Sequence, residues 1–402
     1  MSTDFDVLVV GAGIQGAGTA EALVEAGYSV AILEQSGIAA ATSSRSSKLI
    51  HGGLRYLETG QFHLVRECLR ERQWLLDHKP HLVRMVPFYL PVYRHSRHSP
   101  WQIRLGLSLY SLLAGVSREY ARFRKVPREQ WHTLQGLDQE GLLAVYRYFD
   151  GQTDDAALTH DAINAALHGG ARLVCPASLV GAEVHAGRVL VDYVADGQLN
   201  TLHVRALVNC SGPWVATTNE RCSPPAPLPP LELVAGTHIE LPVMLGDCIF
   251  YLQAEDGRAI FVMPWRGRTL VGTTERSYSG EPQDVAPTVE EERYLLNTVQ
   301  HYFPRTRNLS LNDICDSWAG LRVLPGSNAS PFSRPRETLI ACDNERRPRV
   351  LAVAGGKLTS YRATARKVVR RLRPTLDGDQ SGSNPHTARS DAPSTSEKER
   401  NL

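Results

Sequence analysis

The chain has 402 residues, of which 42% are hydrophobic and 21% are charged, a composition that excludes disorder over its whole length. At roughly 150 residues per domain, this length predicts two or three domains. Lysine and arginine number 44 against 42 aspartate and glutamate, and the net charge of +2 is too balanced to indicate a nucleic-acid partner.

The N-terminal segment predicts a strand–helix–strand unit. Residues 5–10 are apolar, rich in valine and followed by glycine, which indicates a buried parallel strand. We expect a helix over 14–27 and a second strand over 28–34, so that the unit takes about 30 residues.

A loop, several helices and a group of strands are expected next. Residues 35–60 are rich in serine, glycine and threonine and predict an ordered loop. Helical spacing follows over 61–79 and 154–168. The apolar segment 101–116 fits a buried helix and an amphipathic segment lying on a bilayer equally well. Residues 171–209 predict several strands separated by glycine turns.

The C-terminal half begins with more strands. Residues 231–275 alternate in the manner of antiparallel strands, and a helix over 288–303 begins at a Thr-x-x-Glu capping box. A strand over 349–355 leads into a helix over 358–372. From about residue 374 the chain is polar and rich in serine, proline and glycine, which predicts a disordered tail.

The cysteines and the N-terminus indicate a compartment. The seven cysteines form no CxxC pair, which disfavours a disulfide framework and a zinc ribbon and fits a reducing environment. No metal site is expected. No basic segment precedes an apolar stretch, and no run of 18 apolar residues occurs, so we expect neither a secretory signal nor a spanning helix. These features predict a cytoplasmic address and leave the inner face of the cytoplasmic membrane open.

The segment Gly11–Gly16 has the GxGxxG pattern between the first strand and the first helix. In this position the glycines let the backbone approach a pyrophosphate at the helix N-terminus. Glu34, at the end of the second strand, is placed to accept hydrogen bonds from ribose hydroxyls and disfavours a 2′-phosphate. The pattern therefore predicts FAD or NAD rather than NADP.

Two further junctions between a strand and a glycine turn favour FAD over NAD. One is at residues 207–214 and the other at 351–357. Three such junctions converging on one sheet suit a long ligand that is bound by separate segments, as FAD is.

The loop at 42–58 is dense in groups that bind anions. It combines hydroxyls, the backbone amides of Gly52 and Gly53, and the cations Arg45, Lys48 and Arg55. Apolar residues stand between the polar ones, so a flexible solvated linker is disfavoured.

The same loop, TSSRSSKLIHGGLRYLE, closely resembles the FAD-dependent glycerol-3-phosphate dehydrogenases of the respiratory, quinone-linked type. The resemblance continues through VNCSGPW, GTHIELP, VMPW, AGLRVLPG and GGKLTSYR, and covers roughly residues 5–370. Two motifs depart from the family pattern: its GTTD reads Gly272–Glu275 here, and its GVRPL reads Gly320–Leu324. The C-terminal helical domain that is usual in the family is not expected in this chain.

The resemblance implies an α/β fold with a Rossmann-like FAD-binding domain built from discontinuous segments, and a substrate domain with a mostly antiparallel sheet. The FAD-binding domain would take residues 1–80, 150–222 and 315–373. The substrate domain would take 81–149 and 223–314, and 374–402 would be a disordered tail.

The activity that the resemblance implies is oxidation of sn-glycerol 3-phosphate to dihydroxyacetone phosphate, with a hydride passing to flavin N5 and electrons passing on to a quinone. The partners are then a small phosphorylated substrate and a quinone, with peripheral membrane contact and a homodimer left open. Two alternatives stay open: an FAD enzyme of this fold that oxidises an amino acid or a 2-hydroxy acid, and a non-catalytic FAD-binding paralogue. A simple NAD dehydrogenase would be colourless.

The resemblance also implies a set of cofactor-binding residues, which come from seven separate stretches of the chain. These are Gly11, Gly13, Ile14, Gln15, Gly16, Glu34, Gln35, Thr42, Ser43, Ser44, Lys48, Leu49, His51, Gly52, Ser178, Leu179, Ser211, Gly212, Trp214, Gly320, Gly355, Gly356, Lys357, Leu358 and Thr359.

The substrate side should provide permanent, forked cations for a phosphate, because arginine binds phosphate with two donors. Arg55 and Arg322 are the expected pair, although a structural ion pair would also explain Arg322. Arg336, or Arg334 beside it, is a weaker third. The catalytic set is His238, Arg55, Arg322, Lys357 and His51, and the substrate-binding set is Arg55, Tyr56, His238, Thr274, Arg322 and Arg336. His238 is favoured over His51 as the general base.

Overall fold

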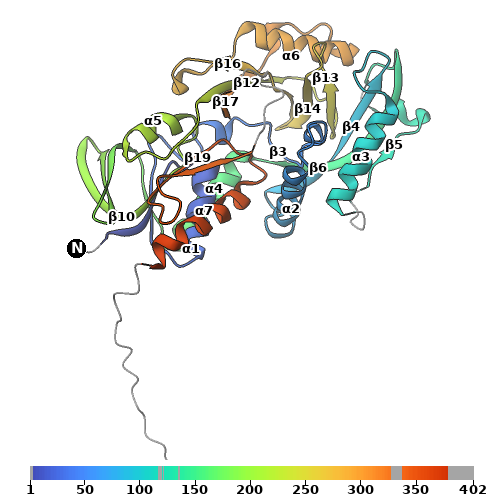
Figure 1. The fold of residues 1–402 in the computed structure, drawn as a ribbon. Helices are drawn as coiled ribbons and strands as arrows, with labels where there is room; N and C mark the ends of the chain where they lie inside the picture. Colours follow the sequence, from blue (N-terminus) through green and yellow to red (C-terminus); the bar gives the residue numbers. More distant parts are fainter. Residues whose placement is uncertain (1–2, 116–119, 121, 135, 327–336, 379–402) are drawn as a thin grey trace, which may run out of the picture.

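The computed structural model describes residues 3–115, 120, 122–134, 136–326 and 337–378. Within these residues the strands form one sheet of nine strands and one of ten, and helices pack against both (Figure 1). The predicted α/β class is confirmed.

The first sheet has the strand order β11-β8-β9-β10-β1-β2-β7, with β19 paired to β10 and β18 paired to β19. Its centre is parallel, whereas β8, β9 and the first part of β10 form an antiparallel meander. The strands are β1 (Phe5–Val10), β2 (Val30–Leu33), β7 (Arg172–Val174), β8 (Ala177–His185), β9 (Arg188–Ala195), β10 (Gln198–Asn209), β11 (Cys222–Ser223), β18 (Leu339–Cys342) and β19 (Val350–Ala354).

Alternation along β1 explains the two covered faces of this sheet. Val7 and Val9 pack against the helices α1 (Ile14–Glu25), α4 (Asp155–His168) and α7 (Tyr361–Leu376). Leu8 and Val10, which alternate with them, face the β8–β9 pair on the other side of the sheet. A strand buried on both faces reads as a continuous apolar run, which is why residues 5–10 could be recognised as a strand.

The second sheet has the strand order β16-β12-β15-β14-β13-β4-β6-β3, with β17 paired to β12 and β5 paired to β6. Apart from the parallel pair β13 and β4, its pairings are antiparallel. The strands are β3 (Leu49–Ile50), β4 (Val83–Tyr93), β5 (Arg124–Lys125), β6 (Leu142–Thr153), β12 (Leu231–Leu241), β13 (Ile249–Gln253), β14 (Ala259–Trp265), β15 (Arg268–Gly272), β16 (Arg276–Tyr278) and β17 (Asp316–Pro325).

Three helices cover the second sheet. The helix α6 (Val289–Tyr302), which begins at the expected capping box, packs on one face. The helices α2 (Phe62–His78) and α3 (Pro100–Ala114) pack on the other, so that α6 and the α2–α3 pair lie on opposite sides of the sheet (Figure 1). The short helix α5 (Val215–Glu220) follows the end of β10.

Three details differ from the sequence-based division. The strand β17 pairs along its length with β12, so residues 316–325 belong to the second sheet although 315–373 were expected in the FAD-binding domain. The helix expected over 358–372 runs over Tyr361–Leu376 and includes Pro374 near its end, so the predicted tail begins later than 374. The predicted disorder of 379–402 lies outside the described residues.

Candidate active site

A cavity of about 380 Å³, here called the central cavity, lies where the two sheets meet. Its walls include the turn after β1, the loop at 34–56, the turn after β10, strand β17, and the loop between β19 and α7, together with residues of β8, β13 and β14. Because parallel strands present their carboxyl ends at one edge of a sheet, the turns after β1, β2, β10 and β19 meet there.

The turn between β1 and α1 runs tightly against the end of β10. Gly11 has a φ of 102°, and a Cβ at this position would lie 2.7 Å from the carbonyl oxygen of Cys210. A Cβ on Gly16 would lie only 1.9 Å from the carbonyl oxygen of Gly11. Both positions therefore require glycine, and the N-terminus of α1 comes to the cavity wall as the GxGxxG pattern predicts.

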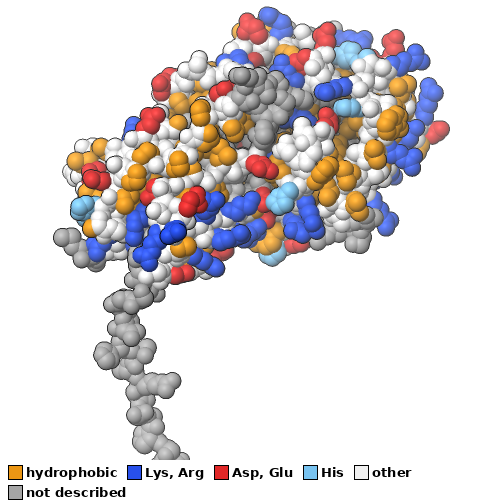
Figure 2. Space-filling view, viewed as in Figure 1, with side chains coloured by type: hydrophobic (Ala, Val, Ile, Leu, Met, Phe, Trp, Pro, Cys, Tyr) orange, Lys and Arg blue, Asp and Glu red, His pale blue; other side chains and the backbone are white. Residues whose placement is uncertain are grey.

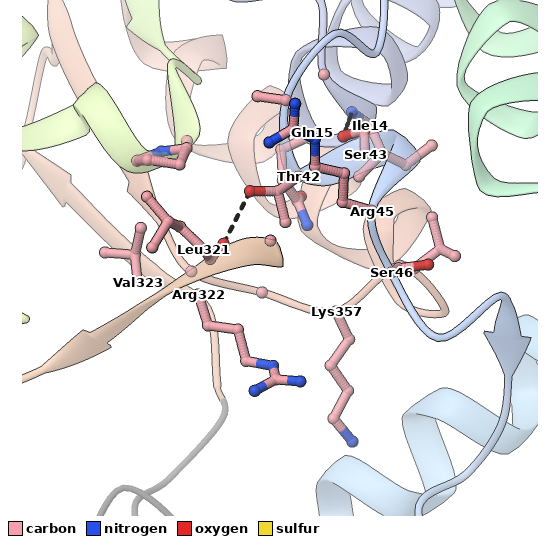
Figure 3. Close-up of a pocket in the computed structure, with 18 of the residues that line it drawn as sticks. Ile14, Gln15, Thr42, Ser43, Arg45, Ser46, Leu321, Arg322, Val323 and Lys357 are labelled. Carbon is pink, nitrogen blue, oxygen red and sulfur yellow. Dashed lines mark hydrogen bonds between the residues drawn. The ribbon is translucent and has the colours of Figure 1, made fainter. Parts of the chain in front are cut away.

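Hydrogen bonds fix the polar groups around this turn. The backbone amide of Ala12 donates to Glu34 Oε2 at 2.7 Å, and the amide of Ser36 donates to Glu34 Oε1 at 2.9 Å. The amide of Ile14 donates to Ser43 Oγ at 2.9 Å (Figure 3). A carboxylate and a hydroxyl are thereby held at the cavity wall, beside the first turn of α1.

The cavity residues fit FAD. The Oε1 atom of Gln15 is buried and has no hydrogen-bond partner within the described part of the chain, so a donor on a bound group would satisfy it. The ribityl hydroxyls of FAD are such donors. Gly355 and Gly356 have φ values of 72° and 94°, and a Cβ on Gly356 would lie 2.6 Å from Gln15 Nε2, so this loop gives the backbone close access to a ligand.

The other end of the central cavity is cationic. Arg55, Arg322 and Lys357 line it, and the side chains of Arg322 and Lys357 extend away from Gln15, Thr42 and Ser43 (Figure 3). The ammonium of Lys357 lies 3.4 Å from the centre of the Tyr56 ring. These residues come from three elements that are far apart in sequence, so only the folded chain unites them.

The acidic side chain of Glu275 lies among these cations. Its Oε1 atom is 3.9 Å from Arg55 Nη1 and 3.8 Å from Arg322 Nη1. The Arg322 guanidinium also donates to Thr273 Oγ1 at 3.2 Å, and it packs over Gly236, where a Cβ would lie 2.9 Å from both terminal nitrogens.

The two histidines have different places. His51 lines the central cavity, and burial together with Lys357 and Arg55 lowers its pKa to about 3. His238 does not line it: the ring is buried on β12, stacks on Trp318 and lies 2.9 Å through Nε2 from the Oγ atom of Ser47. Burial, Arg322 and Lys48 hold the pKa of His238 well below its usual range. Both rings are therefore neutral near pH 7.

Most of the expected site residues line the central cavity. They are Gly11, Gly13, Ile14, Gln15, Glu34, Gln35, Thr42, Ser43, Leu49, His51, Arg55, Tyr56, Ser178, Leu179, Ser211, Gly212, Trp214, Gly320, Arg322, Gly355, Gly356, Lys357, Leu358 and Thr359. The structure thus brings the expected cofactor and substrate groups to one place.

Six of the expected residues do not line the cavity, and Arg336, with Arg334, lies outside the described residues. The six are Gly16, Ser44, Lys48, Gly52, His238 and Thr274. Lys48 turns inward instead, donating to Asp155 Oδ1 at 2.7 Å with its ammonium between two tryptophan rings. The hydroxyl of Thr274 donates to Glu291 at 2.6 Å and accepts from the Thr237 amide, so Thr274 supports the strand edge rather than contacting a ligand.

The structure adds residues that the sequence reasoning left out. Glu275, Arg258, Tyr251 and Phe261 line the central cavity. The signal for Glu275 was its place at the end of the GTTE motif. Arg258 follows a Asp-Gly turn, and the two aromatic residues read as ordinary strand positions, so nothing in their local sequence marked them.

A second cavity of about 640 Å³, here called the side cavity, adjoins the first and shares Leu54, Arg55, Tyr251 and Ala259 with it. Its other walls are mostly apolar side chains of α3, β4 and β13.

The outer face of α3 is unusually apolar. Trp101, Leu105 and Leu112 are 66%, 63% and 64% exposed. Hydrophobic and basic side chains gather side by side on the part of the surface where α3 lies (Figure 2). Within the described part of the chain, no helix is both long enough and apolar enough to cross a bilayer.

Comparison with known proteins gives a consistent result. Residues 6–362 match the family model described as "FAD dependent oxidoreductase" (DAO). A glycerol-3-phosphate dehydrogenase of Pseudomonas aeruginosa is 39% identical over 379 residues, which are 92% of this chain and 72% of that protein. A D-erythritol 1-phosphate dehydrogenase of Brucella abortus is 35% identical over 395 residues, covering 93% of this chain and 75% of that protein.

Among solved structures, a glycerol-3-phosphate dehydrogenase from Bacillus halodurans complexed with FAD superimposes with a TM-score of 0.73 at 26% identity. The match covers 93% of this chain and 65% of that one, so this chain spans about two thirds of the length of that protein.

Proposed function

Since the chain belongs to the DAO family of FAD-dependent oxidoreductases, we propose that it oxidises the secondary alcohol of glycerol 3-phosphate to the ketone, dihydroxyacetone phosphate. The observation that carries the proposal is the pair Arg55 and Arg322 at the cationic end of a cavity whose other end fits FAD. Permanent, forked cations suit a phosphate, and Lys357 adds a third positive charge at the same end of the cavity.

In this proposal the residues at the two ends of the central cavity have different roles. FAD, when bound, supplies an acceptor for the hydride released from the substrate carbon. The first turn of α1, Ser43 and Glu34 hold its nucleotide half. Arg55 and Arg322 hold the phosphate and so fix the alcohol carbon in the central cavity.

We propose that His51, rather than His238, accepts the hydroxyl proton of the alcohol. His51 lines the cavity and is neutral, so its imidazole has a lone pair that can accept the hydroxyl proton. Burial is the main cause of the lowered pKa of His51, and repulsion from Lys357 and Arg55 adds to it. A phosphate dianion at Arg55 opposes that repulsion, so substrate binding raises the basicity of the ring.

The test is an anaerobic titration of the FAD-loaded protein, followed at the absorption band of oxidised flavin at about 450 nm. Glycerol 3-phosphate is expected to bleach the band, whereas glycerol, glycine and L-lactate are not. D-erythritol 1-phosphate belongs in the same series because the Brucella abortus relative is 35% identical. Bleaching by lactate or glycine, with none by either polyol phosphate, would contradict the proposal.

We further propose that the electrons leave to a quinone at a membrane surface. Support comes from the apolar side cavity, which shares Arg55 and Tyr251 with the central cavity, and from the exposed apolar side chains of α3, of which Leu105 and Leu112 themselves line the side cavity. An apolar helix face next to basic residues is suited to lie in a bilayer interface, where a quinone is dissolved.

The double variant Leu105→Glu/Leu112→Glu should lower the rate of quinone reduction, with a long-chain quinone in phospholipid vesicles, by about tenfold. Insertion of α3 into the bilayer would bury two carboxylates, and the cost of burying them opposes insertion. Reduction of a small water-soluble dye should not change. Leu199→Glu is the matched control. Leu199 is equally exposed, but it lies on β10 of the first sheet, whereas α3 packs on the second sheet. An unchanged quinone rate in the double variant would refute the role of α3.

A further inference from the structure

We propose that Glu275 is a resident counter-anion of Arg55 and Arg322, and that it sets the affinity of this site for dianions by competing with them for the two guanidinium groups. The inference rests on the proposed function, because it takes these arginines as the phosphate-binding pair. It concerns a residue that the proposed reaction itself does not use.

The geometry of the three side chains supports the proposal. One carboxylate oxygen, Oε1, lies 3.9 Å from Arg55 Nη1 and 3.8 Å from Arg322 Nη1, so it is almost equally distant from the two cations. The side chain of Glu275 is 9% exposed, whereas those of Arg55 and Arg322 are 20% and 26% exposed. An anion that bound both arginines would therefore meet this carboxylate at close range.

The backbone holds Glu275 in this place. Its carbonyl oxygen accepts a hydrogen bond from Arg258 Nη1 at 3.1 Å. Arg322 is fixed from the other side, by Thr273 Oγ1 and by the lack of a side chain at Gly236. These contacts place the Glu275 carboxylate and the Arg322 guanidinium 3.8 Å apart in the ligand-free cavity.

The electrostatic consequence has a definite sign. Without a ligand, Glu275 balances part of the charge of Arg55, Arg322, Arg258 and Lys357, all of which line the central cavity. With a bound anion, the same carboxylate repels it. Coulomb repulsion is proportional to the ligand charge, so Glu275 weakens the binding of a dianion more than that of a monoanion.

The experiment measures anion binding to the FAD-loaded protein without turnover, by calorimetry or by the change in flavin absorption. The probes are sulfate, which is a dianion throughout the neutral range, and acetate, which is a monoanion. In Glu275→Gln the dissociation constant for sulfate is expected to fall by about tenfold and that for acetate by about threefold, in line with their charges. Glycerol 3-phosphate should show a lower KM in the same variant.

Glu240→Gln is the matched control. Glu240 is a buried glutamate that also pairs with an arginine, Arg268, at 3.1 Å, but neither residue lines the central cavity or the side cavity. Sulfate affinity should not change in this variant. If Glu275→Gln does not retain FAD, Glu275→Asp is used, because it withdraws the carboxylate by one methylene and should tighten sulfate binding by a smaller factor.

The results separate this inference from the proposed function. Sulfate that binds no more tightly to either Glu275 variant than to the wild type would overturn the inference, even if glycerol 3-phosphate bleaches the flavin. Equal tightening of sulfate and acetate would also overturn it, because charge would then not be the cause. If sulfate binds more tightly to the Glu275 variants but glycerol 3-phosphate does not bleach the flavin, the inference about Glu275 is upheld and glycerol 3-phosphate is rejected as the substrate.

Discussion

Replacing Arg322 with glutamine is expected to lower kcat/KM for glycerol 3-phosphate by about a thousandfold, because removing one partner of a partly buried, charge-assisted phosphate contact leaves the anion without its forked donor. The flavin should stay bound, since Arg322 lies at the cationic end of the cavity, away from Gln15 and Ser43 (Figure 3). Steady-state kinetics measures the loss, and the absorption spectrum measures the flavin.

Two further variants show whether the loss arises from the phosphate contact. Arg322→Lys keeps the charge but not the fork, and should recover part of the activity. Arg268→Gln removes an arginine that pairs with Glu240 outside both cavities, and should change kcat/KM little. Loss of flavin from Arg322→Gln, or equal losses in both glutamine variants, would mean that Arg322 supports the fold instead.

The parts of the fold that the sequence predicted well are those set by local rules. The βαβ unit at the N-terminus follows from apolar periodicity and the glycines of the first turn, and α6 begins at its capping box. Residues 315–373 were expected in the FAD-binding domain, but β17 pairs with β12, which lies about 80 residues away in the chain. Pairing over such a distance depends on the whole topology, which local periodicity does not encode.

Contacts between residues far apart in the chain also explain why some expected site residues do not line the central cavity. Lys48, in a loop rich in serine, resembles an anion ligand, but Asp155, its partner, is 107 residues away and draws the ammonium into the interior. Alternation on β12 predicts that His238 lies on the same side as Gly236, which lines the central cavity. It does not show that Ser47 occupies the cavity wall beside the ring. Motifs thus located the site, and tertiary contacts decided which of their side chains face it.

The largest effect on the cofactor is expected for Gly16→Ala. The added Cβ would lie 1.9 Å from the carbonyl oxygen of Gly11 and 3.4 Å from the Cβ of Cys210, and both neighbours belong to the packed end of the first sheet. The helix α1 must then move away from the turn, and its N-terminus would leave the position expected to meet the pyrophosphate of FAD. We expect the purified variant to hold less than about 10% of the FAD held by the wild type.

The ratio of flavin to protein absorbance measures this loss, and far-UV circular dichroism shows whether the variant is folded. Gly37→Ala is the matched control: Gly37 also lines the central cavity, but its added Cβ would meet only the Cβ of Ala40, at 3.9 Å. This control should keep its flavin. A folded Gly16→Ala protein that remains yellow would show that the turn after β1 does not hold the cofactor, and the fit of the cavity to FAD would then have to rest on β10 and the loop before α7 alone.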